Sequence, residues 1–425
     1  MKTLKILVAV FAVLSIAAVA GADSYSVLHE FSGSDDANPV GDVIISGSTL
    51  YGMTSGDGTT GTIFKMNING TGYSVLHTFA GGGADGGNPE GSLTLLGSTL
   101  YGMTCNGGDN DSGTVFKIDT DGNNFSLLHE FAGGGSDGAR PYHSNLIVSG
   151  STLYGVTTYG GDNNAGTIFQ IDTAGNNFSL LHEFTAPTNQ SCPFGGLVLS
   201  GSTFFGMSSG VDPEGMDDSN GSIYKIDIDG DNFSLVHQFA GGGNDGRFPA
   251  GGLILSEGML YGMTLFGGDY NSGSVFKISE EGGDITLLHE FTEGMYPSSG
   301  SLTLIEGVLY GMTRAGVDPE EGDGTIFKVS IDGTGFALLH EFAGGANDGR
   351  SPRGSLVYSD NTLYGMTYYG GDANAGVVLG YELEGGGGDV PEPSTLLLLL
   401  PFIGLGLRKM RKGSSNKKIG EKLSS

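Results

Sequence analysis

Seven histidines recur once per repeated segment, and they are the first candidates for metal binding or acid–base chemistry. They are His29, His77, His129, His182, His237, His289 and His340. Metal ligands must converge within coordination distance, whereas residues that recur once per structural unit are kept apart by the units. Strand alternation also predicts that each histidine shares a face with apolar neighbours, as in Phe125, Leu127, His129 and Phe131. We therefore interpret these histidines as hydrogen-bonded packing residues.

Acidic residues gather in two kinds of glycine-rich loop. One kind carries Asp57, Asp109, Asp162, Asp269 and Asp372, and the other carries Asp36, Asp85, Asp137, Asp245 and Asp348. Carboxylate-rich loops can bind calcium, but Gly and Asp are also the ordinary residues of tight turns. We favour the turn interpretation. If strands alternate up and down, both kinds of loop lie on the same rim, which is then strongly negative.

Two longer loops contain more carboxylates than a turn requires, and they are the calcium candidates. Their acidic residues are Asp212, Glu214, Asp217 and Asp218 in the first loop, and Asp318, Glu320 and Asp323 in the second. Calcium is the one cofactor that the sequence suggests.

A single active site would have to break the repeat symmetry. The breaks are Arg140-Pro141-Tyr142-His143, residues 187–194 with Cys192, Arg314 and the two long acidic loops. None of them forms a nucleophile elbow, a zinc motif or a phosphate-binding loop, so no catalytic or cofactor-binding residue is assigned. Glycoside cleavage by paired carboxylates stays open, because sequence spacing does not fix their separation in space.

These side chains must be positioned by a repeat of about 50 residues that occurs seven times. In the second copy, four runs have strand character: 91–96, 98–104, 113–119 and 125–131. Short turns join them, which predicts a four-stranded antiparallel sheet. Seven such sheets bury their faces against one another in a β-propeller. A linear solenoid is the alternative architecture.

The two ends of the repeat region favour the closed ring. The region begins with a fourth-strand segment at Tyr25–Phe31 and ends after a third-strand segment at Gly376–Gly385. The first segment can therefore complete the last sheet. The sequence predicts an all-β, seven-bladed β-propeller over residues 23–385, closed by its N-terminal strand.

Composition indicates an acidic protein. The formal net charge is −28, and without residues 1–22 and 408–425 the chain has 10 basic and 46 acidic residues. Such a body repels nucleic acid and favours cations or cationic partners. Cys105 and Cys192, the two cysteines, fall in loops of non-neighbouring repeats, and we expect two separate thiols rather than a disulfide.

Both ends of the chain have the pattern of targeting signals. Residues 1–22 have two lysines, an apolar stretch and small residues near the end, the layout of a signal peptide; a retained membrane helix is the alternative. Residues 386–395 form a Gly/Pro linker, 396–407 a short hydrophobic segment and 408–425 a basic tail. The tail is expected to stay cytoplasmic. A plain C-terminal membrane anchor is the alternative to a processed signal.

The C-terminal pattern resembles the PEP-CTERM sorting signal of bacteria that export proteins alongside an exopolysaccharide matrix. The residues that match it are Pro391, Glu392, Pro393, Arg408, Lys409, Arg411 and Lys412. The resemblance implies cleavage near the motif by an exosortase, after a signal peptidase has removed the N-terminus. The chain is then exported and lies at the cell surface or outside the cell, with transient or permanent anchoring in the inner membrane.

The repeat itself resembles the GloVer tandem repeat, which has LLHxF, LYGMT-like and GTxFK-like segments and covers the chain from Tyr25 to Gly385. That resemblance implies an exported propeller and no established reaction. We expect a non-catalytic surface or matrix protein whose acidic rim binds polysaccharide, cations or another protein. The alternatives are an extracellular glycan-active enzyme, either a hydrolase or a lyase, and an architectural spacer without a ligand.

Overall fold

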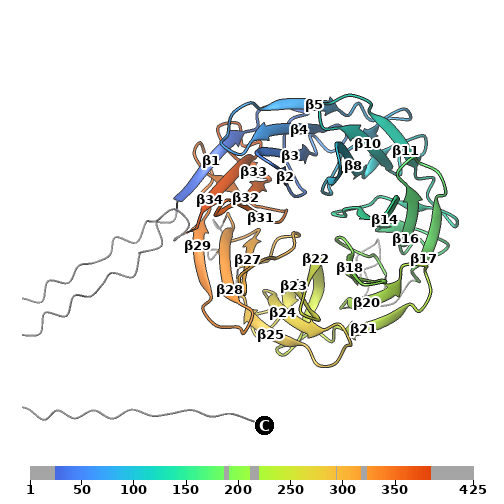
Figure 1. Cartoon of the computed structure of the whole chain (residues 1–425). Helices are drawn as coiled ribbons and strands as arrows, with labels where there is room; N and C mark the ends of the chain where they lie inside the picture. The colour runs from blue at the N-terminus through green and yellow to red at the C-terminus, as the bar shows by residue number, and fades with distance from the viewer. Residues whose placement is uncertain (1–23, 186–190, 211–219, 293, 317–322, 384–425) are drawn as a thin grey trace, which may run out of the picture. The chain divides into compact units, whose positions relative to one another are not determined.

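The computed structural model describes residues 24–185, 191–210, 220–292, 294–316 and 323–383. These residues form seven four-stranded antiparallel sheets arranged around a central axis (Figure 1). The predicted all-β, seven-bladed propeller is confirmed. All the described strands belong to one compact unit.

Blades 1 to 4 follow one another along the chain. In each blade the first strand lies nearest the axis and the fourth strand lies farthest from it. Blade 1 is β2 (Ile44–Ser46), β3 (Thr49–Thr54), β4 (Thr62–Asn67) and β5 (Ser74–Thr78). Blade 2 is β7 (Thr94–Leu96), β8 (Thr99–Thr104), β10 (Thr114–Asp119) and β11 (Ser126–Glu130). Blade 3 is β13 (Ile147–Ser149), β14 (Thr152–Thr157), β16 (Thr167–Asp172) and β17 (Ser179–Glu183). Blade 4 is β18 (Val198–Ser200), β19 (Thr203–Ser208), β20 (Ser222–Asp227) and β21 (Ser234–Gln238).

Blades 5 to 7 complete the ring. Blade 5 is β22 (Gly246–Ser256), β23 (Met259–Gly267), β24 (Ser274–Ser279) and β25 (Thr286–Glu290). Blade 6 is β26 (Thr303–Ile305), β27 (Val308–Thr313), β28 (Thr325–Ser330) and β29 (Ala337–Glu341). Blade 7 is β31 (Val357–Ser359), β32 (Thr362–Thr367), β34 (Val377–Glu382) and, from the other end of the chain, β1 (Ser24–Glu30).

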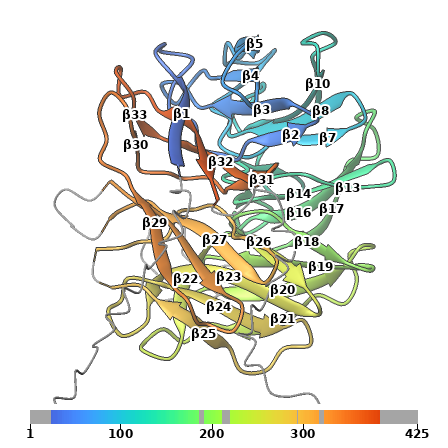
Figure 2. The same ribbon diagram turned by 60° about the vertical axis from the view of Figure 1, so that its left-hand side comes forward.

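The N-terminal strand closes the ring. β1 pairs antiparallel with β34, with Tyr25 opposite Tyr381 and His29 opposite Val378. Figure 2 shows β1, coloured blue, beside the orange-red strands from the other end of the folded region. Because the last blade joins segments from both ends of the folded region, the ring cannot open without breaking a strand pair.

The core is divided into seven clusters, one between each pair of neighbouring blades. A typical cluster joins Tyr51 and Met53 of blade 1 to Leu100 and Phe116 of blade 2. Within the second strand a glycine is required, because a side chain at Gly102 would lie 2.5 Å from the Phe116 ring. The recurring Leu-Tyr-Gly-Met sequence therefore alternates large side chains toward both neighbours while leaving room for the aromatic ring of the third strand.

A β-bulge in the outer strand corrects one expectation from the sequence. Leu127 pairs with Phe116 and His129 with Val115, so Leu128 is extra in the register. The bulge turns the strand, and Phe125 and Leu127 pack toward blade 1 whereas Phe131 packs toward blade 3. His129, which stacks on Phe178 of blade 3, therefore shares a face with Phe131 but not with Phe125 and Leu127, because simple two-residue alternation fails at the bulge.

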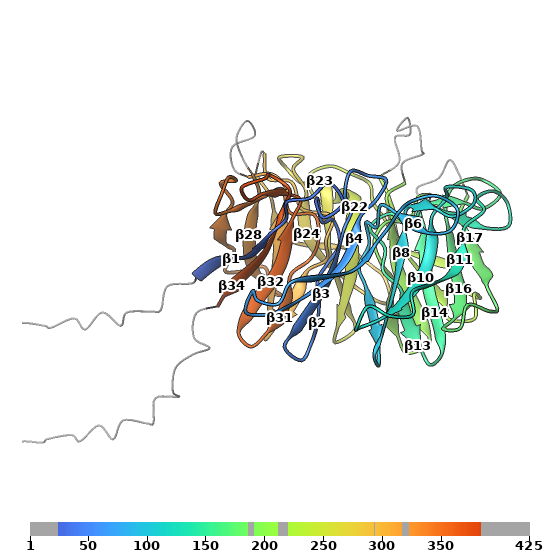
Figure 3. The same cartoon turned by 90° about the horizontal axis from the view of Figure 1, so that it is seen from above.

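Three two-stranded sheets, which the sequence did not predict, tie loops together at one face of the ring. They pair β6 (Gly86–Gly87) with β9 (Asn106–Gly107), β12 (Gly138–Ala139) with β15 (Tyr159–Gly160), and β30 (Gly349–Arg350) with β33 (Tyr369–Gly370). In blade 5 the equivalent pairing is part of the long strands β22 and β23. We call this face, which carries the connections between blades and the loops between second and third strands, the loop face; β6 lies at its edge in Figure 3.

No helix in the described part of the chain has the length and apolar character needed to cross a membrane. The predicted signal peptide and hydrophobic C-terminal segment lie outside the described residues.

Candidate functional site

The repeated histidines join neighbouring blades. His77 stacks on Phe125 of the next blade, with ring centroids 3.8 Å apart, and its Nε2 lies 3.2 Å from both carboxylate oxygens of Asp85. The same ion-pair geometry links His129 to Asp137 and His237 to Asp245. The interpretation of these histidines as hydrogen-bonded packing residues is confirmed for these blades, and each histidine lies at a different interface.

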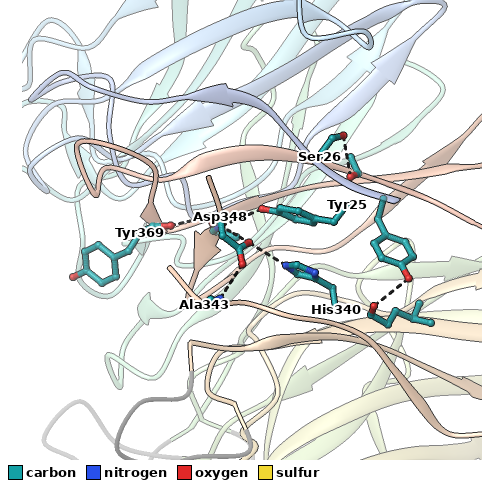
Figure 4. Close-up of polar contacts among 11 residues, drawn as sticks. Tyr25, Ser26, His340, Ala343, Asp348 and Tyr369 are labelled. Carbon is teal, nitrogen blue, oxygen red and sulfur yellow. Dashed lines mark hydrogen bonds and ion pairs between the residues drawn. The ribbon is translucent and has the colours of Figure 1, made fainter. Parts of the chain in front are cut away.

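The closing interface uses the same arrangement with residues from both ends of the folded region. Tyr25 of β1 stacks on His340, and the Tyr25 hydroxyl accepts a hydrogen bond of 3.1 Å from the Gly349 amide. The Asp348 carboxylate faces His340 Nε2 at 3.0 Å and accepts from the Ala343 amide at 2.8 Å (Figure 4). The carboxylate therefore fixes the loop, the histidine and the N-terminal strand together.

The inter-blade aspartates are consequently occupied by structural contacts. Asp85, for example, also accepts hydrogen bonds from the amides of Ala80 and Gly86. Hydrogen bonds from His77 and from these amides hold the pKa of Asp85 below its ordinary value, against the opposing effect of burial. In the other kind of loop, Asp109 and Asp162 are exposed. The acidic rim thus consists of an engaged set of carboxylates and an exposed set.

The axis of the propeller is almost closed by small residues. A side chain at Gly41 would lie 1.9 Å from the Gly91 carbonyl oxygen, and one at Gly300 would lie 2.1 Å from that of Gly354. Polar contacts link the innermost positions: the Ser355 amide donates to Asp42 at 2.6 Å, and the Asp42 amide donates to Ser92 at 2.9 Å. The remaining axial cavity has a volume of about 30 Å³, enough for about one water molecule.

Charged side chains from different blades lie around this axial cavity. Glu90, His143 and Arg353 all line it, and His143 Nε2 is 3.8 Å from Glu90 Oε2. Burial raises the pKa of Glu90, which Asn88 and the charges of Arg353 and Arg140 partly offset. Burial and then the charge of Arg353 lower the pKa of His143 to about 4. At neutral pH the histidine is therefore uncharged.

Lysines and arginines occupy different parts of the propeller. All five lysines of residues 24–383 occupy the same repeated position in third strands, and Lys65 and Lys277 donate to carbonyl groups of the next blade at 3.1 and 2.8 Å. All five arginines of that range lie on the loop face, at positions whose residue type varies between repeats: Arg140, Arg247, Arg314, Arg350 and Arg353. The lysines serve the architecture, whereas the arginines vary from blade to blade.

Aromatic rings accompany these arginines around the axis. The Arg353 guanidinium lies 3.6 Å from the centre of the Tyr368 ring, and that of Arg314 lies 6.0 Å from the Tyr296 ring. On the other side, the rings of His143 and Phe194 are 4.8 Å apart. We call this arginine and aromatic arc, together with the axial cavity, the axial mouth; its members are Glu90, Arg140, Tyr142, His143, Phe194, Phe248, Phe266, Tyr296, Arg314, Arg353 and Tyr368.

An apolar cavity forms one part of the axial mouth, between blades 4 and 5. It has a volume of about 260 Å³ and is lined by Phe194, Ser209, Phe248, Pro249, Leu265 and Phe266. Arg247 lies against two of its rings, 5.4 Å from the centre of Phe248 and 5.3 Å from that of Phe266. The mouth thus combines an apolar side and a cationic side, an arrangement suited to a ligand with both kinds of surface.

The sequence-predicted site residues divide into three groups. The structure brings Arg140 and His143 to the axial mouth together with Arg314, as repeat-breaking positions. Asp323, a calcium candidate, instead forms an ion pair of 2.8 Å with Arg350. The other calcium candidates and the sorting-motif residues lie outside the described residues: Asp212, Glu214, Asp217, Asp218, Asp318, Glu320, Pro391, Glu392, Pro393, Arg408, Arg411, Lys409 and Lys412.

Among the residues that the structure describes, no group of three or more His, Cys, Asp or Glu side chains is placed to hold a metal ion. The calcium hypothesis for loops 211–221 and 317–324 stays a prediction. Cys105 and Cys192 are both buried thiols and form no disulfide, as the sequence predicted.

Sequence reasoning missed Glu90, Arg353 and four aromatic residues of the mouth, Phe248, Phe266, Tyr296 and Tyr368, whereas Tyr142 and Phe194 lie in segments that it had singled out. Glu90 and Arg353 both follow a recurring proline and precede a recurring glycine, and Ala250 stands at the same place in the fifth repeat. Comparing the copies position by position would have shown that this site varies in charge and size while its neighbours are kept. Only the ring closure shows that these variable positions meet.

The fold and the mouth together define a closed seven-bladed propeller with a variable site at its axis. The chain belongs to the Gloeobacter/Verrucomicrobia repeat family, whose model matches residues 15–216 and 208–390. No curated protein matches the sequence.

The chain is similar to several solved structures. One is an oligogalacturonate lyase in complex with manganese, with 10% identity, a TM-score of 0.52, and coverage of 86% of this chain and 97% of that chain. A nidogen/laminin complex has 15% identity, a TM-score of 0.37, and coverage of 58% and 76%. A prolyl endopeptidase has 12% identity, a TM-score of 0.47 and coverage of 80% and 49%, so this chain spans about half its length. At these identities the likeness concerns the fold alone.

Proposed function

We propose that this chain is an exported, non-catalytic propeller that binds a polysaccharide of the cell surface or extracellular matrix at its axial mouth. The observation that carries the proposal is the gathering of arginines and aromatic rings at a place where the repeats diverge. Aromatic faces pack against the C–H faces of sugar rings, and arginine donates several hydrogen bonds to their oxygen atoms.

The inner mouth is better suited to this role than the acidic rim. Asp85, Asp137 and Asp348 of the rim are engaged with histidines and backbone amides, so binding a ligand there would cost those contacts. Arg353 and Tyr368 already stack on each other, which holds both side chains in place before a ligand arrives. Preorganisation of this kind lowers the entropic cost of binding.

A glycan-active enzyme is the second candidate, because His143 and Glu90 lie 3.8 Å apart with Arg353 beside them. The axial cavity next to this pair has a volume of only about 30 Å³, which is too small for a sugar ring. Binding without reaction is therefore the better-supported function. Incubation of the purified chain with a panel of polysaccharides should yield no new reducing ends or unsaturated products.

A thermal-shift screen of the purified full-length chain against extracellular polysaccharides tests the binding function. A ligand that binds the native state raises the melting temperature by mass action. We expect a rise with at least one polysaccharide, and we expect Phe194→Ala and Tyr368→Ala to reduce it. A flat screen across neutral and acidic polysaccharides would overturn the proposal and favour an architectural role.

Export and anchoring are part of the same proposal. We expect a signal peptidase to remove residues 1–22 and an exosortase-type enzyme to cut near Pro391–Pro393. Mass spectrometry of the protein recovered from the outside of expressing bacteria would locate both ends. A mature chain that retains residues 396–425 would show a plain membrane anchor instead.

A further inference from the structure

The arginines of the mouth suggest a more specific ligand. Arg314 follows β27 in blade 6, and Arg353 precedes β31 in the neighbouring blade 7. Arg314 is exposed, and its backbone amide donates to the Tyr296 carbonyl at 2.8 Å, which fixes where its side chain starts. Arg353 is partly buried and lies 3.6 Å from the centre of the Tyr368 ring. The backbone of Arg314 and the side chain of Arg353 are therefore held in place on the same side of the axis.

The segments that carry the two arginines are in contact, because the Ser298 hydroxyl, close to Tyr296, donates to the carbonyl of Gly354 next to Arg353 at 3.4 Å. Partial desolvation is the larger cause of a lowered pKa at Arg314, and the like charge of Arg353 adds to it. Within the described residues, the arginine that forms an ion pair is Arg350, with Asp323. Two like charges brought together in a protein with an excess of carboxylates are stabilised when an anion lies between them.

The nearest acidic group balances only part of this charge. Glu90 feels the charges of both Arg353 and Arg140, and its own pKa is raised by burial. Asp109 and Asp372 are exposed on loops between second and third strands. Within the described residues, neither Arg314 nor Arg353 forms an ion pair with a carboxylate, in contrast to Arg350.

We infer that Arg314 and Arg353 bind the carboxylate of a uronic-acid residue while Tyr368 or Tyr296 contacts the sugar ring. Arginine presents a planar set of donors that matches a carboxylate in a bidentate manner, and two arginines can engage both oxygens. This inference rests on the proposed function and specifies its ligand: an acidic polysaccharide rather than a neutral one.

Isothermal titration calorimetry of the full-length chain with three hexasaccharides tests this assignment. The probes are hexagalacturonate, its fully methyl-esterified form and cellohexaose. The ester retains the sugar and the linkage but removes the charge, so it is the matched control. We expect hexagalacturonate to bind at least about tenfold more tightly than its ester, because a charge-assisted contact is replaced by a neutral one.

Variants separate the two arginines from the general charge of the face. Arg314→Gln and Arg353→Gln should each weaken hexagalacturonate binding by about tenfold or more and leave binding of the ester nearly unchanged. Arg350→Gln removes the same charge from the same face but at an arginine already paired with Asp323, and it should leave the affinity unchanged. Arg353→Lys should retain only part of the affinity for hexagalacturonate, because lysine keeps the positive charge but lacks the planar guanidinium group. Circular dichroism melting checks that every variant is folded.

The outcomes distinguish the inference from the proposed function. Equal affinity for hexagalacturonate and its ester would overturn the carboxylate assignment while leaving a carbohydrate-binding mouth. Binding that Arg350→Gln weakens as much as Arg353→Gln would show a diffuse electrostatic effect and would also overturn it. A sulfated glucan hexamer that binds more tightly than hexagalacturonate, with the same arginine dependence, would replace the carboxylate by a sulfate. If no hexasaccharide or polysaccharide binds, both proposals fail.

Discussion

Tyr25 and His340 lie face to face, with ring centroids 3.9 Å apart and ring planes 5° apart, although they come from opposite ends of the folded region. At five other interfaces the partner of the histidine is an aromatic residue of the next blade along the chain, such as Phe178 for His129, whereas the equivalent residue in the repeat after His237 is Ile285. The closing interface repeats this contact with a residue that precedes the first blade. The ring is thus closed by side-chain packing as well as by the β1–β34 strand pair.

The Tyr25 hydroxyl should contribute measurably to closure. Tyr25→Phe keeps the stacked ring but removes the hydroxyl, which hydrogen-bonds to Asp348 and shares the Gly349 amide with that carboxylate, and we expect a loss of about 1 kcal/mol in the free energy of unfolding. Chemical denaturation would measure it. Tyr270→Phe is the control, since Tyr270 is 59% exposed and should change little. A Tyr25→Phe variant as stable as this control would show that the hydroxyl contributes nothing to closure.

His182 and His289, which have no acidic partner among the described residues, should make stability depend on pH. The aspartate of four other blades lies eight residues after the histidine, but Gln190 and Pro297 stand there after His182 and His289. Burial lowers the pKa of both His182 and His289 to about 4. In the unfolded chain the histidine pKa is near 6.5, so the unfolded chain binds protons at a higher pH than the folded chain does. The free energy of unfolding therefore falls as the pH drops from about 6.5 to about 4.

Melting temperatures at pH 7 and pH 5 would check this dependence. The double variant His182→Gln/His289→Gln should lose less stability between these pH values than the unmodified chain. The difference should be about 1–2 kcal/mol per histidine once partial solvent screening is allowed for. His340→Gln is the matched control, because this histidine faces Asp348. This variant should not show the same reduction in the stability lost between pH 7 and pH 5. An unchanged slope in the double variant would contradict the prediction.

Acid should act on the paired aspartates in a lower range. Hydrogen bonds from His340 and the Ala343 amide hold the pKa of Asp348 below 3.8, although burial alone would raise it. Its stabilising contribution is therefore complete above about pH 4 and is lost only as the pH falls through the lower folded-state pKa. Asp348→Asn should reduce the loss of stability between pH 4 and pH 2, as followed by circular dichroism. A loss as large as that of the unmodified chain would contradict this assignment.

The innermost glycines should tolerate no side chain. Gly41→Ala places a Cβ 1.9 Å from the Gly91 carbonyl oxygen, and backbone atoms on both sides prevent an easy adjustment. We expect a loss of about 3 kcal/mol or more in urea denaturation. Gly33→Ala is the control, because the nearest atoms to its Cβ are 3.4 Å away. Equal stability of the two variants would show that the ring widens at little cost.

The two cysteines should be unreactive in the native protein. Cys105 is fully buried, its thiol lies 3.6 Å from the Pro141 carbonyl oxygen, and burial raises its pKa well above the ordinary value. Both features suppress the reactive thiolate. A thiol-labelling reagent should modify neither cysteine in buffer and both in denaturant without reductant. Absence of labelling in denaturant would instead indicate a disulfide.

Much of the fold could be predicted from the sequence because each repeat carries its own local instructions. Leu-Tyr-Gly-Met-Thr and Gly-Thr-Ile-Phe-Lys read as strands, and glycine-rich segments between them read as turns. The offset between the segments at Tyr25 and Gly376 was enough to predict closure. Strand ends were less accurate, since the predicted first strand at 91–96 begins at Thr94 in the structure. The residues before it approach the axis and bond to neighbouring blades.

The bulge at Leu128 and the roles of the aspartates could not be read in this way. A bulge inserts one residue into a strand without an obvious change in composition, and it reverses which side chains face a given neighbour. Asp85 and Asp109 both sit in glycine-rich loops, yet one is held by a histidine and the other is exposed. Their difference depends on contacts between loops rather than on either loop alone.

The sequence by itself determined the number of blades, the strand types and the closure of the ring, because these follow from periodicity and from the order of segments along the chain. Only the tertiary structure decided where the chemistry gathers. Glu90, Arg314 and Arg353 are distant in sequence and belong to different repeats, and they meet because the ring brings the same edge of every blade to one axis. A repeat pattern records what the blades share, whereas the candidate site is built from the residues in which they differ.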